Sequence, residues 1–436
     1  MGIQNFPAAL QPIIQQSFLE REFQDGIHSR LGFRSIADRE TFPAAIGETL
    51  TKTRRGLKAP VETPLDPATN TNLDNGLTAG GWTVEQYALS VAMYGDTIDL
   101  NVVTSRVGIA GQFMENAKVN GVQSIQSLDR LARNTLFGAY LGGNTRVTAT
   151  LGAPAVTVAV DDIRGFQYVT SNGVMVPVSV AHPMTVVIGA GSYTLTGSTA
   201  DGVNVSTAPK GVSGTLTLSG NVTVANGTTG KAVVASVAPV VIRPNARAAT
   251  SDIVAADTLT MQDVLSAVAT LRSNNVPTAE GGLYNCYLDD KQLLGLFKDA
   301  DFKLLYRGAY GSETYKNGQI IELLGVRFVP TTEAPQQTLS GVVIHRAIVC
   351  GQGAIIEGNY ADTGYSDVDN PDSLKVMVDD ICMVTREPLD RLQQIIAQSW
   401  YWIGGYAIPT DITANTTIIP TASNSYFKRG IVIESA

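Results

Sequence analysis

Cysteine, histidine and charged residues are scarce in this sequence of 436 residues, which has 3 cysteines, 3 histidines and 16% charged residues. Cys286, Cys350 and Cys382 are odd in number, lie far apart and each stand in an apolar segment. Such cysteines are typical of buried thiols and not of a disulfide framework. We therefore predict three reduced thiols in the core.

Motifs that carry chemistry are also missing. No histidine–cysteine spacing suits zinc, and no Gly-x-Ser-x-Gly elbow or Walker-type phosphate loop occurs. The acidic stretch Asp367–Asp372 looks like a calcium loop, but Pro371 interrupts its ligand pattern and no glycine stands at the sixth position. We predict no enzyme activity, no catalytic residue, no metal site and no cofactor, and we place His345 in the core or at an interface.

Long apolar runs and an excess of positive charge are the last two absences. No segment offers about 18 consecutive apolar residues, so we expect no membrane span. Residues 1–16 lack the basic start and apolar run of a secretory signal. The formal net charge of -8 argues against nucleic-acid binding as the main activity.

The first hundred residues indicate two appendages. Residues 8–29 read as an amphipathic helix whose apolar side chains include Phe18 and Phe23, within an N-terminal arm of residues 1–42. Residues 43–100 then indicate two extended limbs around a tip rich in proline, asparagine and glycine. An isolated two-stranded ribbon of this kind is marginally stable, so both appendages need a surface to rest on.

Helical periodicity is strongest over residues 108–141, where apolar side chains recur on one face and Gly142 and Gly143 follow. We assign residues 101–144 to this long helix.

Residues 145–250 are different, because they are rich in glycine, threonine, serine and valine and carry little charge. Turn signals recur at Ser171–Gly173, Gly191–Ser192, Ser219–Asn221 and Asn226–Gly227. They predict short strands, including 168–170, 174–180, 215–218, 222–225 and 232–237, in a small β-barrel or sandwich.

Residues 251–365 predict an α/β region. Thr260 is placed to cap a helix over 261–273, and a strand over 283–288 precedes a helix capped by Asp289. The apolar face of that second helix is predicted to hold Leu293, Leu294 and Phe297. Residues 315–330 predict a hairpin that turns at Gly325, and residues 342–350 predict a strand buried on both faces.

Residues 366–436 predict further strands at 374–378, 382–386 and 392–407, which we group with the C-terminal segment as one region. The predicted fold class is therefore α+β, with an inserted all-β domain at 145–250.

A strand, a capped helix and a hairpin follow one another here, and the hairpin has the pattern "Gly-x-Ile-x-x-Leu-x-Gly-Val-x-Phe-Val" from Gly318 to Val329. This order resembles the axial domain of tailed-bacteriophage major capsid proteins. These proteins share the fold named after phage Hong Kong 97. The resemblance covers residues 1–144 and 251–436 as an ordered series. It implies an N-terminal arm, an extended loop, a spine helix, an axial domain at 251–365 and a peripheral domain at 366–436.

The same resemblance implies a function. The chain is expected to self-assemble as hexamers and pentamers into the icosahedral head of a tailed phage, located in the virion after assembly in the host bacterial cytoplasm. Expected partners are further copies of the chain, a portal, and scaffold or decoration proteins, with double-stranded DNA enclosed but not read by sequence. Two rival functions stay open, a nanocompartment shell like that of encapsulins and a β-rich adhesin or carbohydrate-binding protein.

One charged cluster allows three interpretations. Lys52, Arg54, Arg55 and Lys58 place four cations within eight positions of the first limb. They read as a solvated loop, as a DNA contact, or as a surface that docks acidic residues of a neighbouring subunit. The acidic candidates are Asp367, Asp369, Asp372, Asp379 and Asp380.

Overall fold

The structure is a computed structural model that describes residues 21–24, 32–42, 49–62, 81–101, 109–201, 211–307, 322–360, 373–386, 388, 391–392, 394–412 and 415–436. The chain divides into two compact units. The first contains Met1–Leu50, Ala88–Arg133 and Ile356–Ala407, and the second contains Thr51–Tyr87, Asn134–Ile355 and Ile408–Ala436.

The first unit is built around a six-stranded sheet. Its strands are β1 (Asp38–Phe42), β19 (Ile356–Tyr360), β22 (Ile395–Ala407), β21 (Ile381–Arg386), β20 (Ser373–Val378) and β4 (Ala92–Asn101). Burial alternates along β22, as a strand with one covered face requires. The predicted strands at 374–378, 382–386 and 392–407 are thereby confirmed.

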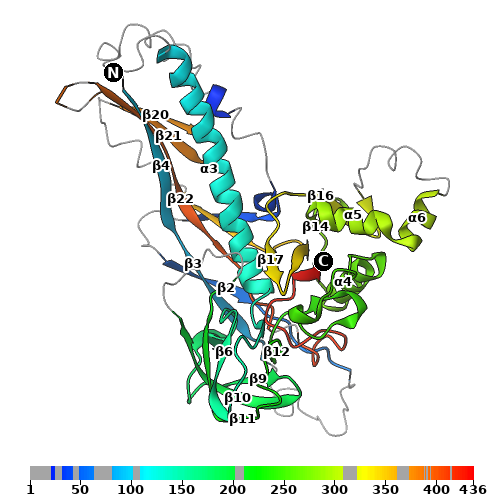
Figure 1. The fold of residues 1–436 in the computed structure, drawn as a ribbon. Helices are drawn as coiled ribbons and strands as arrows, with labels where there is room; N and C mark the ends of the chain where they lie inside the picture. The colour runs from blue at the N-terminus through cyan, green and yellow to red at the C-terminus, as the bar shows by residue number, and fades with distance from the viewer. Residues whose placement is uncertain are drawn as a thin grey trace, which may run out of the picture. The chain divides into compact units, whose positions relative to one another are not determined.

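The long helix α3 (Ile109–Tyr140) covers this sheet, and Figure 1 shows it running along β20, β21 and β22. Phe113, Ile125 and Leu128 of the helix share a core with Trp400 and Trp402 of β22. A polar link crosses the same interface, because Asn120 donates to the carbonyl of Gln398 at 3.0 Å and the Gln398 side chain donates to the carbonyl of Phe113 at 3.1 Å. The helix predicted over 108–141 is confirmed.

The N-terminal segment is tied into the first unit by a buried ion pair. Arg34, in the short helix η2 (Phe33–Ile36), meets Glu357 in a two-pronged contact of 2.6 and 2.9 Å. Its backbone N–H donates to Asp129 of α3 at 2.9 Å. Residues 21–24 are helical and Phe23 is fully buried in the core of this unit. The rest of the helix predicted over 8–29 lies outside the described residues.

The second unit contains a seven-stranded sheet. Its strands are β13 (Val241–Ile242), β23 (Gly430–Ser435), β18 (Val342–Cys350), β14 (Tyr284–Leu288), β16 (Val326–Pro330), β15 (Glu322–Leu323) and β17 (Gln336–Leu339). β15 and β16 form the predicted hairpin, turning at Leu324 and Gly325, both of which have positive φ. The predicted burial of β18 on both faces is confirmed from Ile344 onward.

Three helices accompany this sheet: α4 (Met261–Ser273), α5 (Asp290–Lys298) and α6 (Ala300–Arg307). The predicted caps are confirmed, because Thr260 accepts from the N–H of Asp263 and Asp289 accepts from the N–H of Gln292. The predicted face of α5 is wrong at Leu294, which is 46% exposed, whereas Leu296 is buried. Leu293 and Leu296 are three residues apart, so they share a helix face that Leu294 does not.

The three cysteines are free and buried, as predicted. Burial raises the pKa of the Cys286 thiol to about 12. His345 is also a core residue, and it is paired with Asp289.

The assignment of the C-terminal segment to one region with β20–β22 is wrong from Ile408 onward. These residues belong to the second unit, where β23 pairs with β18 on one side and β13 on the other. The pairing with β13 is parallel and joins residues far apart in the chain, which no local pattern announces. The domain boundary at 365 also differs, because β19 belongs to the first unit.

Residues 144–235 form the predicted all-β region, a six-stranded antiparallel sheet whose strands are labelled together in Figure 1. In sheet order its strands are β5 (Asn144–Arg146), β12 (Ala232–Ala235), β9 (Met184–Ile188), β10 (Gly191–Ala200), β11 (Gly214–Val222) and β6 (Ala155–Val160). A bridge between Val147 and Val160 joins the two ends of the sheet, so the sheet closes into a barrel and leaves no edge between them.

Two details of the barrel differ from prediction. The turn expected at Ser219 and the strand expected over 222–225 are wrong, because β11 continues to Val222 through an irregular register. A separate hairpin, β7 (Tyr168–Ser171) with β8 (Val174–Pro177), turns at Asn172 and Gly173 as predicted.

A chain of buried polar side chains, here called the junction network, links the barrel to the seven-stranded sheet. Glu434 of β23 binds Arg243 at 2.8 Å and Arg346 at 2.9 Å. Arg346 donates to Gln337 at 2.7 Å, and Gln337 donates to Asp161 of the barrel at 2.9 Å. The barrel is therefore held by directional contacts as well as by its covalent connections.

Candidate functional site

The described residues contain no group of three or more histidine, cysteine, aspartate or glutamate side chains placed to hold a metal ion. Among the same residues, no helix has the length and apolar character needed to cross a membrane. The candidate site described below is the surface formed by the paired strands at residues 49–55 and 84–90, with the contacts that hold these strands.

The ribbon consists of β2 (Thr49–Arg55) and β3 (Val84–Ser90), which pair as a two-stranded sheet, together with residues 56–62 and 81–83, which continue from the paired ends of the two strands. This confirms the two predicted limbs, while the tip at 63–80 lies outside the described residues. Gly56 continues the pairing, because its N–H donates to the carbonyl of Thr83 at 2.9 Å.

Charged groups from both limbs meet the C-terminal segment of the second unit, at a place we call the ribbon base. Arg54 of β2 lies 2.8 Å from Oδ1 of Asp411, and Arg429 lies 2.9 Å from Oδ2 of the same carboxylate. Glu85 of β3 is 3% exposed and accepts a hydrogen bond from Thr410 at 3.3 Å. Each limb is thus fixed by a polar contact to the segment that precedes β23.

The ribbon base contains more positive than negative charge. Lys428 is 2% exposed, and within the described residues its Nζ has no hydrogen-bond partner. Burial lowers the pKa of Lys428, against the opposing effect of the Asp411 and Glu85 carboxylates. Burial likewise raises the pKa of Asp411 to about 6, although Arg54 acts in the opposite direction. The contacts of Arg54 with Asp411 and of Glu85 with Thr410 anchor the two limbs to the segment that precedes β23.

The structure separates the four predicted cations. Arg54 is bound within the chain to Asp411, Lys52 is half-buried, and Arg55 and Lys58 are exposed. Of the four cations, Arg55 and Lys58 are therefore the two that lie fully on the surface.

The predicted acidic residues are described only in part. Asp379 and Asp380 form the two-residue turn between β20 and β21, each with positive φ. Asp380 lies 3.2 Å from Arg39 within the first unit, and Asp379 is exposed. Asp367, Asp369 and Asp372 lie outside the described residues, as does Phe18. Phe23 lies in the core of the first unit.

Sequence reasoning missed Asp411, Glu85 and Lys428. Asp411 and Glu85 each stand among neutral neighbours, Lys428 is followed directly by Arg429, and the meeting of these groups depends on pairings between distant segments. The only signal available was that charged residues are few, so each buried one needs a partner.

The ribbon also exposes apolar side chains on the part that belongs to the second unit. Trp82 is 52% exposed, Val84 40%, Leu57 42% and Val61 83%. The other two tryptophans, Trp400 and Trp402, are 3% and 0% exposed. Neighbouring exposed apolar residues on a soluble protein typically mark an interaction surface.

Comparison with known proteins finds similarity among solved structures. No family model and no curated protein matches the chain. The capsid of Ralstonia phage GP4 is similar over 93% of this chain and 88% of its own, with 9% identity and a TM-score of 0.48. The capsid of cyanophage Pam1 is similar over 94% of each chain, with 11% identity and a TM-score of 0.48.

A virus-like particle from Pyrococcus furiosus is similar over 96% of this chain and 98% of its own, with 8% identity and a TM-score of 0.38. Over most of its length the chain is thus similar in structure to shell proteins. Because the identities and TM-scores are low, the proposed function rests on the elements of the chain itself.

Proposed function

We propose that this protein is the major capsid protein of a tailed bacteriophage with the Hong Kong 97-type fold. It assembles as hexamers and pentamers into an icosahedral head that encloses double-stranded DNA, and its role is structural and not catalytic. Its other partners are a portal and scaffold or decoration proteins, and its location is the virion.

The order of elements supports this proposal. A two-stranded ribbon precedes a long helix that packs on a sheet, and a second sheet with capped helices follows in the chain. In this proposal α3 is the spine helix, the first unit contains the peripheral domain, and the seven-stranded sheet is the axial domain. The barrel is an insertion between the spine helix and the axial domain.

The single observation that carries the proposal is the ribbon. Two strands alone are marginally stable, and the ribbon nevertheless exposes four apolar side chains, Leu57, Val61, Trp82 and Val84. At about 25 cal/mol per Å² of apolar surface, covering such side chains stabilises each contact weakly and a closed lattice of contacts strongly. Further copies of the chain are the partner that supplies this cover at every position.

Arg55 and Lys58 are proposed to contact the acidic residues of an adjacent copy, among them Asp379. Both cations are exposed, so their ion pairs contribute mainly to the rate and register of association and little to affinity. Arg54 has a different role in this proposal, because its bond to Asp411 fixes the ribbon within its own chain.

The decisive experiment is negative-stain electron microscopy of the purified full chain and of native particles. Closed icosahedral particles with nuclease-protected DNA are expected. Particles that hold protein cargo without DNA would instead identify a nanocompartment, and a chain that stays small at all concentrations would exclude a shell protein.

A matched pair of variants tests the charged contact. Arg55→Glu with Lys58→Glu is expected to raise the concentration needed for particle formation by about tenfold, while the fold is unchanged, because the reversed charges repel the acidic partner. The control is Lys118→Glu with Lys231→Glu, which reverses two exposed cations elsewhere. Equal assembly of the two double variants would remove the docking role of Arg55 and Lys58.

A further inference from the structure

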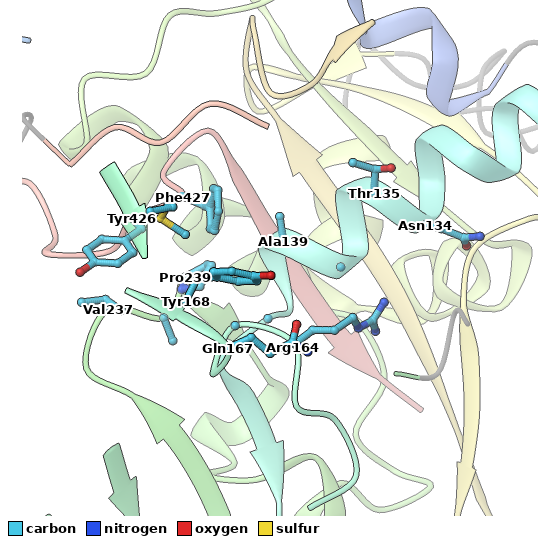
Figure 2. A pocket seen from close by; sticks show the side chains of 15 residues that line it. Asn134, Thr135, Ala139, Arg164, Gln167, Tyr168, Val237, Pro239, Tyr426 and Phe427 are labelled. Carbon is cyan, nitrogen blue, oxygen red and sulfur yellow. The ribbon is translucent and has the colours of Figure 1, made fainter. Parts of the chain in front are cut away.

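A cavity of about 300 Å³ lies in the second unit, where three segments meet at the end of α3. Figure 2 shows its walls, with Ala139 of the helix on one side, Tyr168 of β7 on another, and Pro239 and Phe427 completing it. Tyr168 is 50% exposed, so the cavity opens to solvent. Its lining is mostly apolar.

The charge at the rim of this cavity is already neutralised. Arg164 lies 2.8 Å from Asp162, in an ion pair of two largely buried side chains. An anionic ligand would have to compete with that carboxylate, whereas an apolar group enters without displacing it. The chemistry of the cavity therefore selects an apolar or aromatic group. A 150 Å³ apolar cavity is known to hold benzene, so about 300 Å³ has room for a larger bicyclic ring.

An apolar side chain without cover lies on the same unit. Trp82 is 52% exposed and does not line the cavity of its own chain. The ribbon that carries Trp82 contacts the hairpin that walls the cavity, because the N–H of Gln86 donates to the carbonyl of Gly173 at 3.1 Å. The hairpin that walls the cavity is thus in direct contact with the strand that follows Trp82.

We propose that this cavity receives the side chain of Trp82 from a second copy of the chain, an inference that rests on the proposed function. Tryptophan is enriched among the residues that dominate interface energetics, where it fills a pocket on the partner. In this proposal each copy gives its Trp82 to one neighbour and receives the Trp82 of another, so the contact is head-to-tail. Head-to-tail contacts generate rings where the rotation between copies closes, as the capsomers of a shell require.

Gly138 provides a variant that fills the cavity with little disturbance. It lines the cavity within α3, and a Cβ built there meets only Arg164, at 3.4 Å and beyond. Gly138→Leu therefore fills the space and also improves helix propensity. Gly111→Leu in the same helix is the matched control, because a Cβ at Gly111 meets nothing within 4 Å.

The experiment measures assembly by analytical ultracentrifugation for the wild type, Trp82→Ala, Gly138→Leu and Gly111→Leu. We expect Trp82→Ala and Gly138→Leu each to raise the concentration for assembly at least about tenfold, and Gly111→Leu to behave as the wild type. Mixing the first two variants restores one contact, between the Trp82 of Gly138→Leu and the open cavity of Trp82→Ala. The mixture is therefore expected to form pairs that neither variant forms alone.

The possible failures are distinguishable. A wild type that never assembles overturns the proposed function and this inference together. A wild type that assembles while Gly138→Leu assembles equally well overturns the inference alone. Absence of pairs in the mixture also overturns it, as does a change in tryptophan fluorescence of dilute monomeric Gly138→Leu, because the indole would then occupy the cavity of its own chain.

Discussion

The ribbon base and the junction network both place a carboxylate between two arginines, yet the pKa values of the two carboxylates are shifted in opposite directions. Burial raises the pKa of both groups. At Glu434 the guanidiniums of Arg243 and Arg346 outweigh burial and hold the pKa below its usual range. At Asp411 burial prevails, and the pKa is raised to about 6.

The contacts explain the difference. Glu434 is bound by both arginines and also accepts a hydrogen bond from Thr250 at 2.8 Å, so both of its carboxylate oxygens have a donor. Asp411 has Arg54 and Arg429, but the negative charge of Glu85 opposes its ionisation. A buried carboxylate is thus held ionised by complete pairing and not by the mere presence of arginine. The junction network therefore contains a carboxylate that is held ionised, Glu434, whereas the ribbon base contains one whose pKa is raised to about 6, Asp411.

Glu434→Ala tests the stronger of the two sites and has the largest expected effect. It leaves Arg243 and Arg346 buried without their shared carboxylate, so the free energy of unfolding should fall by about 3–5 kcal/mol. Urea unfolding of the unassembled chain measures this. The control is Glu322→Ala, which breaks an exposed pair with Arg327 and should cost less than about 1 kcal/mol. Similar losses in both variants would contradict the ranking.

Asp411→Asn tests the pH response of the ribbon base. Because the pKa of Asp411 is raised on folding, its proton uptake stabilises the folded chain fully below about pH 4 and is lost as pH rises through about 6. On acidification from about pH 7 to 4 the wild type should gain about 2–3 kcal/mol relative to Asp411→Asn. Glu434→Gln, compared in the same way, should show the opposite sign and only near or below the ordinary glutamate pKa. An equal pH profile for wild type and Asp411→Asn would contradict the raised pKa.

Gln337→Ala tests whether the junction network acts as one unit. The change removes the acceptor of Arg346 and the donor to Asp161, so we expect a loss of about 1–3 kcal/mol in the free energy of unfolding. The neighbouring Gln336→Ala is the control, since Gln336 is exposed and bonds only weakly to Asp289 at 3.2 Å. If the barrel were held by its covalent connections alone, Gln337→Ala and Gln336→Ala would change the free energy of unfolding equally.

Arg54→Ala and Arg55→Ala give the smallest expected difference. Arg54 is 27% exposed in its pair with Asp411, so its removal should cost about 1 kcal/mol, while removal of the exposed Arg55 should change the free energy of unfolding little. Thermal unfolding of the two variants side by side measures this difference. A larger loss at Arg55 would show that the adjacent arginines had been assigned to the wrong roles.

Local patterns were sufficient for much of the fold. The periodicity of residues 108–141 predicted α3 to within one residue at each end, and the capping pair Thr260 and Asp263 located the start of α4. The turn at Asn172 and Gly173 was also visible, because both residues tolerate positive φ. These features depend on neighbours in sequence, which is why they could be predicted.

Long-range pairings could not be predicted in this way. The position of β23 between β13 and β18, and the meeting of Arg54 with Asp411, depend on contacts between distant segments. The charge cluster at 52–58 was recognised as a surface, but its composition alone does not reveal that one of its arginines is already bound within the chain. The barrel strands β6, β9 and β10 were not predicted. In β9 the burial alternates, but the exposed Val187 is as apolar as the buried Val186 and Ile188 beside it, so the sequence itself shows no alternation.

The parallel pairing of β23 with β13 has a consequence for the timing of synthesis. A ribosome has made the helices, the barrel and the hairpin well before it reaches residue 430, and until then the seven-stranded sheet has an open seam beside β18. The ribbon base is incomplete over the same interval, because Asp411 and Arg429 come late as well. Nascent chains therefore hold a loosely anchored ribbon until Asp411, Arg429 and β23 have been made.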